Sequence, residues 1–290
     1  MSITLSNKIR KLANTDFAHA KLQSIPYAPK TLFQIGEIVD QPMVSIIGSR
    51  KHTNYGKYAA EHIAGELARQ GVAIVSGLAL GIDSIAHRAA LRAGGITHAV
   101  LPTGLKSIYP SSHRNLAIEI IQHSGALISE FAPNQTKAYK QNFIQRNRIV
   151  SGLGDVLIVI EASQRSGTLH TVNFALEQGR EVFAVPGPIN SPSSAGTNLL
   201  IQNGAQLLHD PAQIMEYLQI KQAHHPKVEI KFDDESQRTI YGLLGEEQML
   251  HADVLLIHSE LTAQEFNQAL TMLEIYGHIK CIGNNTWTKS

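Results

Sequence analysis

The sequence predicts a doubly wound α/β domain with a mostly parallel sheet, followed by a small winged-helix domain. Two observations lead to this prediction. From residue 43, short runs rich in β-branched residues alternate with amphipathic stretches of helical length, so the strands are connected by helices that cover both faces of the sheet. After residue 235, three short helix patterns precede a hairpin, which is the order of elements in a winged helix.

Seven segments have the short and nearly unbroken apolar character of buried parallel strands. They are 43–47, 72–75, 97–101, 126–129, 155–160, 181–185 and 205–208. A helical pattern lies between the first two strands, and Gly71 is expected to end it. Asp83 can cap the next helix, which Gly94 and Gly95 would close.

The two ends of the chain differ from this repeating pattern. The N-terminal segment has one helix pattern and the stretch SIPYAPKTLFQIG, whose prolines indicate an irregular lead-in; it is too short to hold a full helical domain as well. Near the C-terminus, SQRTIYGLL, MLHADVLLIHS and TAQEFNQALTMLEIYG are the three helices, and the hairpin turns at Gly283-Asn284-Asn285. The predicted domains are a lead-in (1–42), the α/β domain (43–219), a polar linker (220–234) and the winged helix (235–290).

Composition limits the class of protein. No apolar run reaches the roughly 18–20 residues of a membrane span, and the first twenty residues lack the apolar run of a signal peptide. The single cysteine, Cys281, excludes an intramolecular disulfide and fits a reducing, cytoplasmic location. The sequence has no HExxH motif and no Cys/His cluster. We therefore expect no metal, no cofactor and no membrane association.

Charge is distributed unevenly along the chain, although the net charge is only +1. Residues 44–210 contain 14 Lys/Arg and 10 Asp/Glu, whereas residues 221–290 contain 6 and 10. The central domain thus has an excess of four positive charges and the C-terminal segment an excess of four negative charges. A polyanionic ligand should prefer the central domain.

Small residues and hydroxyl groups cluster where the predicted strands end. In an open parallel sheet, ligands bind beyond the carboxyl ends of the strands. Glycine and serine let backbone amides face a ligand there, and helix N-termini add partial positive charge. The segments are GSR (48–50), SGLALGID (76–83), LPTGLKSIYP (101–110), SEF (129–131), EASQRSGT (161–168) and PGPIN (186–190). Any doubly wound domain needs such turns, but the whole set at one edge favours an anion site.

Arginine residues indicate which anion this is. Arg50 stands in the first turn, where a dinucleotide-binding fingerprint would have glycine, and its guanidinium matches the oxygens of a phosphodiester. The alternative for Arg50 is a surface ion pair, and we favour the phosphate contact. Arg146 and Arg148 precede the strand 155–160. On a helix they point about 200° apart, so we expect one at the cleft and the other paired elsewhere.

Four other side chains near the rim allow two interpretations. Phe143 and Tyr109 could stack bases, although core packing is the favoured role of Phe143. Asp83 and His87 lie four residues apart, near Ser76, which would suit acid–base chemistry. We favour the simpler interpretation, in which Asp83 caps a helix and His87 is a packed or hydrogen-bonded neighbour.

Taken together, the motifs along residues 44–218 resemble the DNA-processing protein A (DprA/Smf) family, and the last 55 residues do so less strongly. The resemblance implies an extended Rossmann-like domain in a protein that is not known as an enzyme. It implies binding of single-stranded DNA, protection of incoming DNA, homodimer formation and loading of a RecA-type recombinase in natural transformation. The motifs that carry it, in order, are GSRKHTNYG, IVSGLALGIDSIAH, VLPTGLKSIYP, LISEF, FIQRNRIVSGL, VIEASQRSGTLHT and VFAVPG.

The matching motifs also imply a set of phosphate-binding residues, in which Arg50 would be a main contact. Relatives often have a basic residue directly after the YP pair. Here Ser111 and Ser112 follow it, so Arg114 is the substitute candidate. The expected DNA phosphate-binding set is Gly48, Ser49, Arg50, Ser76, Gly77, Arg114, Arg146, Asn147, Arg148, Ser166, Gly167 and Thr168.

Three other functions fit the sequence less well. Phosphoribohydrolases share this kind of fold and carry a GGxGTxxE motif, but here Thr171 stands at the catalytic Glu position, which disfavours a nucleotide-processing enzyme of that type. A dinucleotide-dependent oxidoreductase would need the missing G-x-G-x-x-G. A duplex-binding transcription factor is suggested by the winged helix, yet its third helix has Glu265 and Glu274 and no Lys or Arg, the wrong sign for phosphates.

Overall fold

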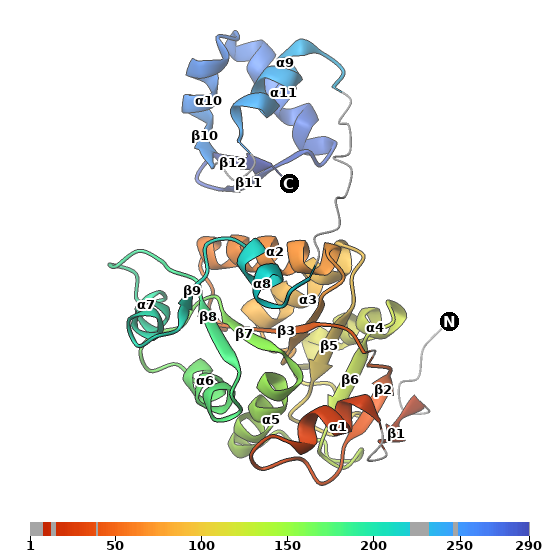
Figure 1. Cartoon of the computed structure of the whole chain (residues 1–290). Helices are drawn as coiled ribbons and strands as arrows, with labels where there is room; N and C mark the ends of the chain where they lie inside the picture. Colours follow the sequence, from red (N-terminus) through yellow and green to blue (C-terminus); the bar gives the residue numbers. More distant parts are fainter. Residues whose placement is uncertain (1–7, 13–15, 39, 221–231, 246–248, 290) are drawn as a thin grey trace. The chain divides into compact units, whose positions relative to one another are not determined.

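The computed structural model of the chain describes residues 8–12, 16–38, 40–220, 232–245 and 249–289. The chain divides into two compact units, 1–223 and 224–290 (Figure 1). Most of the predicted linker, 220–234, lies outside the described residues. None of the described helices combines the length and the apolar character needed to cross a bilayer.

The first unit is built on a nine-stranded sheet. Its parallel strands are β3 (Met43–Ile47), β4 (Ala73–Ser76), β5 (Thr97–Val100), β6 (Ala126–Ser129), β7 (Val156–Val159), β8 (Glu181–Ala184) and β9 (Gln206–Leu207). Two antiparallel strands, β1 (Arg10–Lys11) and β2 (Phe33–Gly36), extend one edge. The strand order is β1-β2-β6-β5-β4-β3-β7-β8-β9. Because the chain builds outward from β3 first on one side and then on the other, the switch point of the topology lies between β3 and β7.

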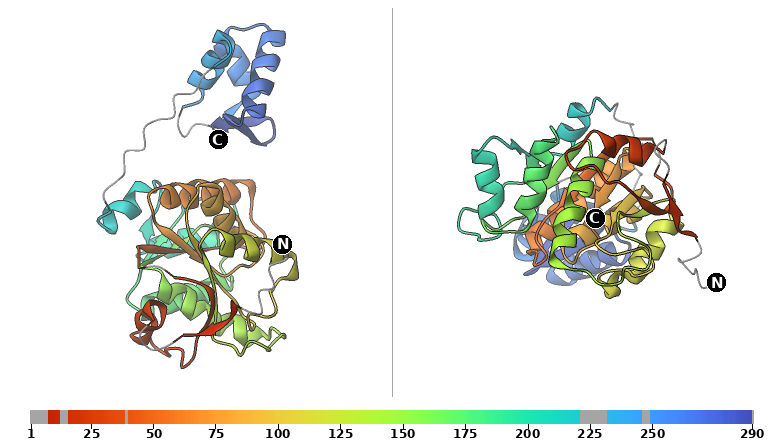
Figure 2. Two further views of the ribbon diagram at one scale, coloured as in Figure 1. Left: turned by 90° about the vertical axis from the view of Figure 1, so that its right-hand side faces the viewer. Right: turned by 90° about the horizontal axis from the view of Figure 1, so that it is seen from below.

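Helices cover both faces of this sheet, as the apolar strands predict (Figure 2). Side chains alternate along each strand, so Val44 and Ile46 enter one core while Met43 and Ile47 enter the other. The first core is closed by α2 (Asn54–Arg69), α3 (Ile82–Arg92) and α8 (Ala212–Tyr217), and the second by α1 (Phe17–Gln23), α5 (Lys140–Leu153) and α6 (Thr168–Glu177). Two further helices complete the unit, α4 (Arg114–Gln122), which packs on β5 and β6, and α7 (Ala195–Gln202).

The N-terminal segment is more regular than the sequence suggested. Where we predicted an irregular lead-in, β2 pairs with β6 and β1 pairs with β2. Leu32 and Ile35 are fully buried there. The prolines that precede β2 hide it from a pattern search, because pairing with β6 rather than local propensity makes this segment a strand.

Two residues were predicted to end or begin the first two crossover helices, and the structure confirms one of these predictions and contradicts the other. Gly71 follows α2 with a φ of 79°, the left-handed conformation expected of a terminating glycine. The helix α3 begins at Ile82, so Asp83 lies inside the first turn and is not the cap that we predicted. Its carboxylate instead accepts hydrogen bonds from the amides of Gly77 and Ala79, which precede the helix.

The second unit is a winged helix, as predicted. Its helices are α9 (Glu235–Leu243), α10 (Ala252–Ser259) and α11 (Ala263–Ile275), and its wing is the hairpin of β11 (Ile279–Gly283) and β12 (Thr286–Lys289). Asn284 and Asn285 form a two-residue turn with φ values of 48° and 53°, the conformation that matches the twist of a hairpin. A short strand that we did not predict, β10 (Leu250–His251), pairs with β12.

Candidate nucleic-acid interface

A cavity of about 840 Å³ opens at the carboxyl ends of the parallel strands of the first unit. It lies at the switch point of the sheet, where the loops after β3 and β7 meet, as in other open α/β sheets. Eight of the twelve predicted phosphate-binding residues line it. They are Gly48, Ser49, Arg50, Arg146, Asn147, Ser166, Gly167 and Thr168.

The loop that carries Arg50 is held at both ends by hydrogen bonds. At its start, the Ser49 hydroxyl accepts from the amide of Lys51 at 3.1 Å and donates to the carbonyl of the same residue at 2.9 Å. At its end, Thr53 caps α2, and the carboxylate of Glu161 accepts from both the amide and the hydroxyl of Thr53, at 3.0 and 2.5 Å. The backbone of this loop is therefore fixed before any ligand arrives.

Gly81 allows a close approach behind the same loop. It has a φ of 81°, and a Cβ atom there would overlap the carbonyl oxygen of Ser49. The amide of Ile82 donates to that oxygen at 3.2 Å. The start of α3 therefore supports the turn from which Arg50 projects.

Arg50 itself is exposed, and its guanidinium packs on an aromatic pair. The guanidinium carbon lies 5.3 Å from the centroid of the Phe143 ring, and that ring lies 5.3 Å from Tyr109 in an edge-to-face contact. Phe143 is half-buried and lines the cavity, so core packing, our favoured interpretation, was wrong for this side chain. Among the described residues, no carboxylate forms an ion pair with Arg50. The positive charge of Arg50 is therefore available to a ligand, next to the rings of Phe143 and Tyr109.

Arg146 forms part of the cavity floor. It is only 4% exposed, and its Nη1 donates to the carbonyl oxygens of Gly77 and Val100, at the ends of β4 and β5. Burial lowers the pKa of this guanidinium to about 10, and the nearby carboxylate of Asp83 opposes the shift, so Arg146 is still protonated at neutral pH. Burial likewise raises the pKa of Asp83, against the charges of Arg146 and Arg50. The floor thus places the Arg146 guanidinium and the Asp83 carboxyl group close together, and each favours the charged form of the other.

The N-terminus of α6 closes the cavity on the other side. The Ser166 hydroxyl donates to the Thr168 hydroxyl at 2.8 Å, and the amide of Thr168 donates to Ser166 at 3.2 Å. The Thr168 hydroxyl in turn donates to the carbonyl of Gly48 at 3.4 Å, which ties this turn to the Arg50 loop. Amides at a helix N-terminus attract anions.

The structure does not bring the other four predicted residues to the cavity wall. Arg148 is 9% exposed and pairs with Glu130 at 2.5 Å, so its charge is already satisfied. Of Arg146 and Arg148, it is therefore Arg148 that pairs elsewhere, as expected for one of the two. The hydroxyl of Ser76 donates to the Ile46 carbonyl of the neighbouring strand at 2.6 Å. Gly77 abuts the Arg146 guanidinium, and Arg114 is exposed at the start of α4.

Sequence reasoning missed two basic residues of the cavity wall, Lys51 and Lys140. Lys51 follows Arg50 in the same turn, and Lys140 begins α5 one turn before Phe143. Both could have been found by extending the search for cations to the residues adjacent to each motif. With Arg50 they place three cations around one opening.

Among the residues that line the cavity, the structure shows no free carboxylate that could take the place of the catalytic Glu of a phosphoribohydrolase. Thr171, which stands at the position of the catalytic Glu, is buried and lines the cavity. Asp83 is the carboxylate among the residues that line the cavity, and two backbone amides occupy it. No group of three or more His, Cys, Asp or Glu side chains able to hold a metal occurs in the part of the chain that the structure describes.

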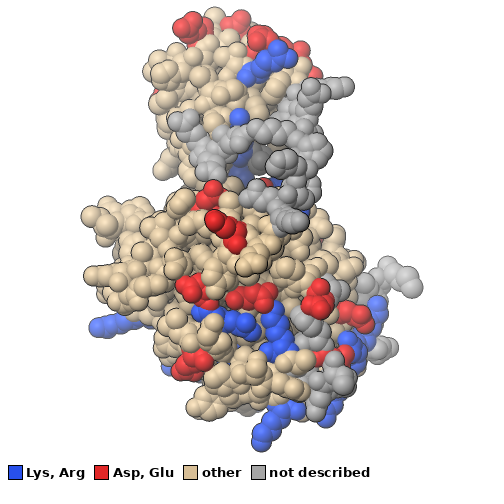
Figure 3. Space-filling model, viewed as in Figure 1, with Lys and Arg blue, Asp and Glu red and all other residues tan. Residues whose placement is uncertain are grey.

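On the face drawn in Figure 3, acidic and basic side chains are mixed on the first unit and do not form one large basic patch. The cations that line the cavity are Arg50, Lys51, Lys140 and Arg146. Such a site suits a ligand that enters with individual phosphates better than a rigid polyanion laid across a face.

Comparison with known proteins identifies relatives over both units. The family model described as DNA recombination-mediator protein A matches residues 9–219, and that described as the DprA winged helix domain matches residues 226–284. Protein Smf of Escherichia coli is 44% identical over 209 residues, which is 71% of this chain and 56% of Smf. DNA processing protein DprA of Bacillus subtilis is 42% identical over 200 residues, covering 68% of this chain and 67% of the relative. The chain thus spans little more than half the length of Smf.

Two solved structures are similar to about three quarters of this chain. That of DNA processing protein A from Streptococcus pneumoniae has a TM-score of 0.66 and 36% identity, covering 75% of this chain and 76% of the other. That of DNA processing protein A from Helicobacter pylori also has a TM-score of 0.66, with 32% identity, and covers 74% and 98%. The H. pylori structure concerns that protein's binding mode for single-stranded DNA.

Proposed function

Because the chain belongs to the DNA recombination-mediator protein A (DprA/Smf) family, we propose that it binds single-stranded DNA through the cavity at the strand ends of its first unit. The family is one of DNA-binding recombination mediators and not of known enzymes. The H. pylori relative, which is similar over 74% of this chain, is described as binding single-stranded DNA.

The observation that carries the proposal is the contact of Arg50 with Phe143, whose ring in turn packs edge-to-face against Tyr109. A single strand offers phosphates along one side and unstacked bases along the other. Guanidinium binds the first, and aromatic rings stack on the second. Here both kinds of group meet at the mouth of one cavity, with Lys51 and Lys140 beside them.

Within this proposal the predicted residues have different roles. Arg50, Lys51 and Lys140 would contact phosphate oxygens. The turn residues would offer amides and hydroxyls to the same phosphates, and Arg146 would supply charge from the floor without leaving its carbonyl partners. The turn residues are Gly48, Ser49, Ser166, Gly167 and Thr168.

Single strands should bind better than duplex. A duplex presents a rigid cylinder whose bases are already stacked, so it could not bring a base to Phe143 or Tyr109 and a phosphate to the floor together. A flexible single strand can bend its backbone into the cavity. The C-terminal segment 221–290 has an excess of four negative charges, which does not favour binding of a duplex.

The wider role proposed for the chain rests on the family alone. It comprises protection of incoming DNA, loading of a RecA-type recombinase in natural transformation, homodimer formation and a cytoplasmic location. The recombinase is the proposed protein partner.

A titration of labelled single-stranded and duplex oligonucleotides of matched sequence tests the proposed function. The affinity for the single strand should be higher at every salt concentration, and its logarithm should fall linearly with the logarithm of salt as counterions are released. Equal affinities for the two forms at matched salt would contradict the proposal.

A further inference from the structure

The loop between β8 and α7, residues 185–194, presents an isoleucine to solvent. Ile189 is 99% exposed, the highest value among the large hydrophobic side chains that the structure describes. Isolated exposed aliphatic residues are common on protein surfaces. Ile189 differs because its loop is fixed and because that loop borders the cavity.

Hydrogen bonds fix the loop along its length. At its start, the Tyr55 hydroxyl donates to the Pro186 carbonyl at 2.7 Å, and Asn198 bonds both the amide and the carbonyl of Gly187 at 3.2 and 3.0 Å. Past the tip, the Ser191 amide donates to the Pro188 carbonyl at 3.0 Å. The exposure of Ile189 is therefore built into the loop.

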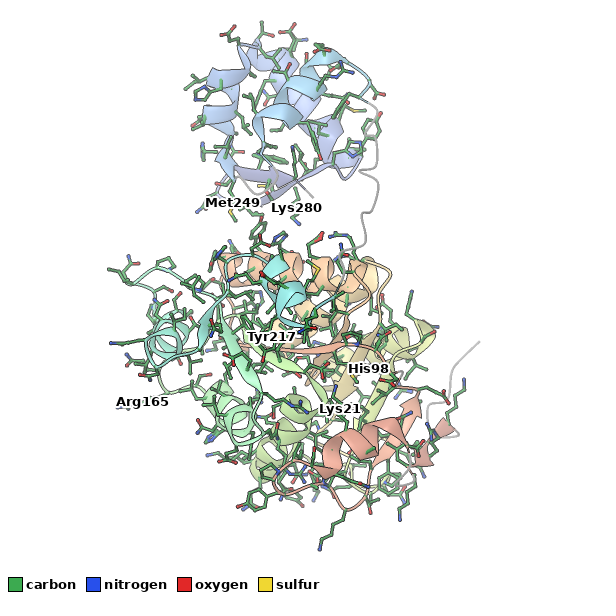
Figure 4. The ribbon with its side chains drawn as sticks, viewed as in Figure 1. Lys21, His98, Arg165, Tyr217, Met249 and Lys280 are labelled. Carbon is green, nitrogen blue, oxygen red and sulfur yellow. The ribbon has the colours of Figure 1, made fainter. Side chains whose placement is uncertain are left out.

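The same loop forms one edge of the cavity. Pro192 and Ser193 line it, and the Ser193 carbonyl accepts from the amide of Ala162 at 2.9 Å, which joins the loop to the segment after β7. That segment carries Arg165, an exposed cation that extends outward from the loop before α6 (Figure 4). Ile189 and Arg165 therefore lie on two loops that are joined by a hydrogen bond. Both loops border the cavity on the side where β7 and β8 end.

We infer that Ile189 contacts a nucleobase just outside the cavity and that Arg165 contacts a phosphate of the same stretch. This inference rests on the proposed function. A strand that leaves the cavity on this side passes the two loops, and its unstacked bases expose apolar faces to the first side chain they meet. Aliphatic side chains inserted between bases are a known means of separating a base step. The contact is independent of sequence because every base has such a face.

Three single substitutions test this inference on the full chain. Ile189→Ala should lower single-strand affinity about fivefold. This is the loss expected if the bound base covers about half of the isoleucine side chain and the variant no longer makes that contact. The slope of affinity with salt should not change, because no charge is lost. Arg165→Ala should instead reduce that slope by about one. Leu176→Ala is the matched control, since Leu176 is an exposed aliphatic residue (61%) at the far end of α6.

A second readout separates a base contact from a change in fold. With 2-aminopurine placed at successive positions of the oligonucleotide, one position should brighten on binding as its base is unstacked. Ile189→Ala should abolish that signal, and Ile189→Leu should keep it. Circular dichroism should be unchanged in all variants.

Two results would overturn the inference, and they are distinguishable. If the native chain binds single strands while Ile189→Ala keeps the native affinity and fluorescence pattern, the base contact is wrong and the proposed function stands. Contact of the loop with another protein would then explain its exposure. If the native chain binds no single-stranded DNA, both the inference and the proposed function fail.

Discussion

At the scale of residues, burial gives the two arginines of the cavity different roles. Arg146 is enclosed and holds the carbonyl ends of two strands, so its charge is a fixed part of the floor. Arg50 is exposed, rests on Phe143 and has no carboxylate partner among the described residues. Loss of Arg146 should therefore affect the fold, whereas loss of Arg50 should affect binding.

Replacement of Arg50 should weaken binding without unfolding the protein. Arg50→Ala should reduce single-strand affinity by roughly 1.5–3 kcal/mol, the usual contribution of a hydrogen bond to a charged group. Arg50→Lys should recover part of this loss, because an ammonium cannot bridge two phosphate oxygens. Fluorescence anisotropy would measure both affinities.

The control for this prediction is Arg92→Ala. Arg92 is also an exposed arginine, but it pairs with Glu61 on the neighbouring helix and lies outside the cavity lining. The Arg92→Ala variant should bind single-stranded DNA with the affinity of the native chain. If Arg50→Ala binds as tightly as Arg92→Ala, Arg50 makes no phosphate contact.

The sequence reveals Arg50 and the turn residues of the site because each stands in a loop that follows a parallel strand, where topology determines which edge of the sheet the loop occupies. It cannot decide between Arg146 and Arg148. Their spacing shows that they diverge, but the rotation of α5 against the sheet, which packing determines, selects the one that reaches the cavity. Ser76 also stands at a strand end, as the last residue of β4, yet its hydroxyl bonds to the neighbouring strand. Local position therefore predicts proximity to the site but not the direction of a side chain.

At the scale of elements, α3 and β5 bury two histidines between them and their neighbours. The Thr97 hydroxyl donates to the Ile74 carbonyl, so Nδ1 of His87 is the donor in its 2.6 Å bond to Thr97. Nδ1 of His98 accepts from the amide of Ala126. The accepting Nδ1 requires a neutral His98 ring, and burial favours the neutral form of both rings. Burial lowers the pKa of His87 to about 3 and that of His98 to about 4.

These lowered pKa values predict a loss of stability in mild acid. Below about pH 6.5 the two histidines are protonated in the unfolded chain but remain neutral in the folded one. Their contribution to the free energy of unfolding is therefore fully present above pH 6.5 and is lost as the pH falls toward 4. Each histidine contributes a slope of about 1.4 kcal/mol per pH unit over that window. Asp83, whose pKa is raised, acts in the opposite direction.

Denaturant unfolding of the native chain and of His87→Asn between pH 4.5 and 7.5 would isolate the His87 contribution. Asparagine can keep the donor to Thr97 but cannot take up a proton. The variant should therefore lose stability less steeply in acid. Parallel curves for the two proteins would mean that His87 is not neutral and buried in the fold.

The sequence predicted those elements that have a continuous apolar run or that are stabilised by interactions between residues close in sequence. The parallel strands β3 to β8 are apolar runs bounded by turns, and α11 has a capping box between Thr262 and Glu265. The missed strands β1, β2 and β10 are short and antiparallel. Each exists because a partner strand lies beside it, which is information that a single segment does not contain.

At the scale of the whole molecule, the two units have separate cores and opposite charge. The core of the winged helix includes Leu270 and Leu273, so these side chains stabilise their own unit, whereas Ile275 is exposed. The α11 helix carries Glu265 and Glu274 and no cation. On electrostatic grounds the first unit is the one that should bind DNA, and the second is better suited to contacts with protein.

The measurement that tests this account most directly is the single-strand affinity of the isolated segments 1–223 and 224–290. Segment 1–223 contains the whole cavity and should bind within about threefold of the full chain. Segment 224–290 should bind neither single strands nor duplex. If 1–223 still melts cooperatively but has lost its single-strand affinity, the account is contradicted, because the winged helix would then bind DNA despite its charge.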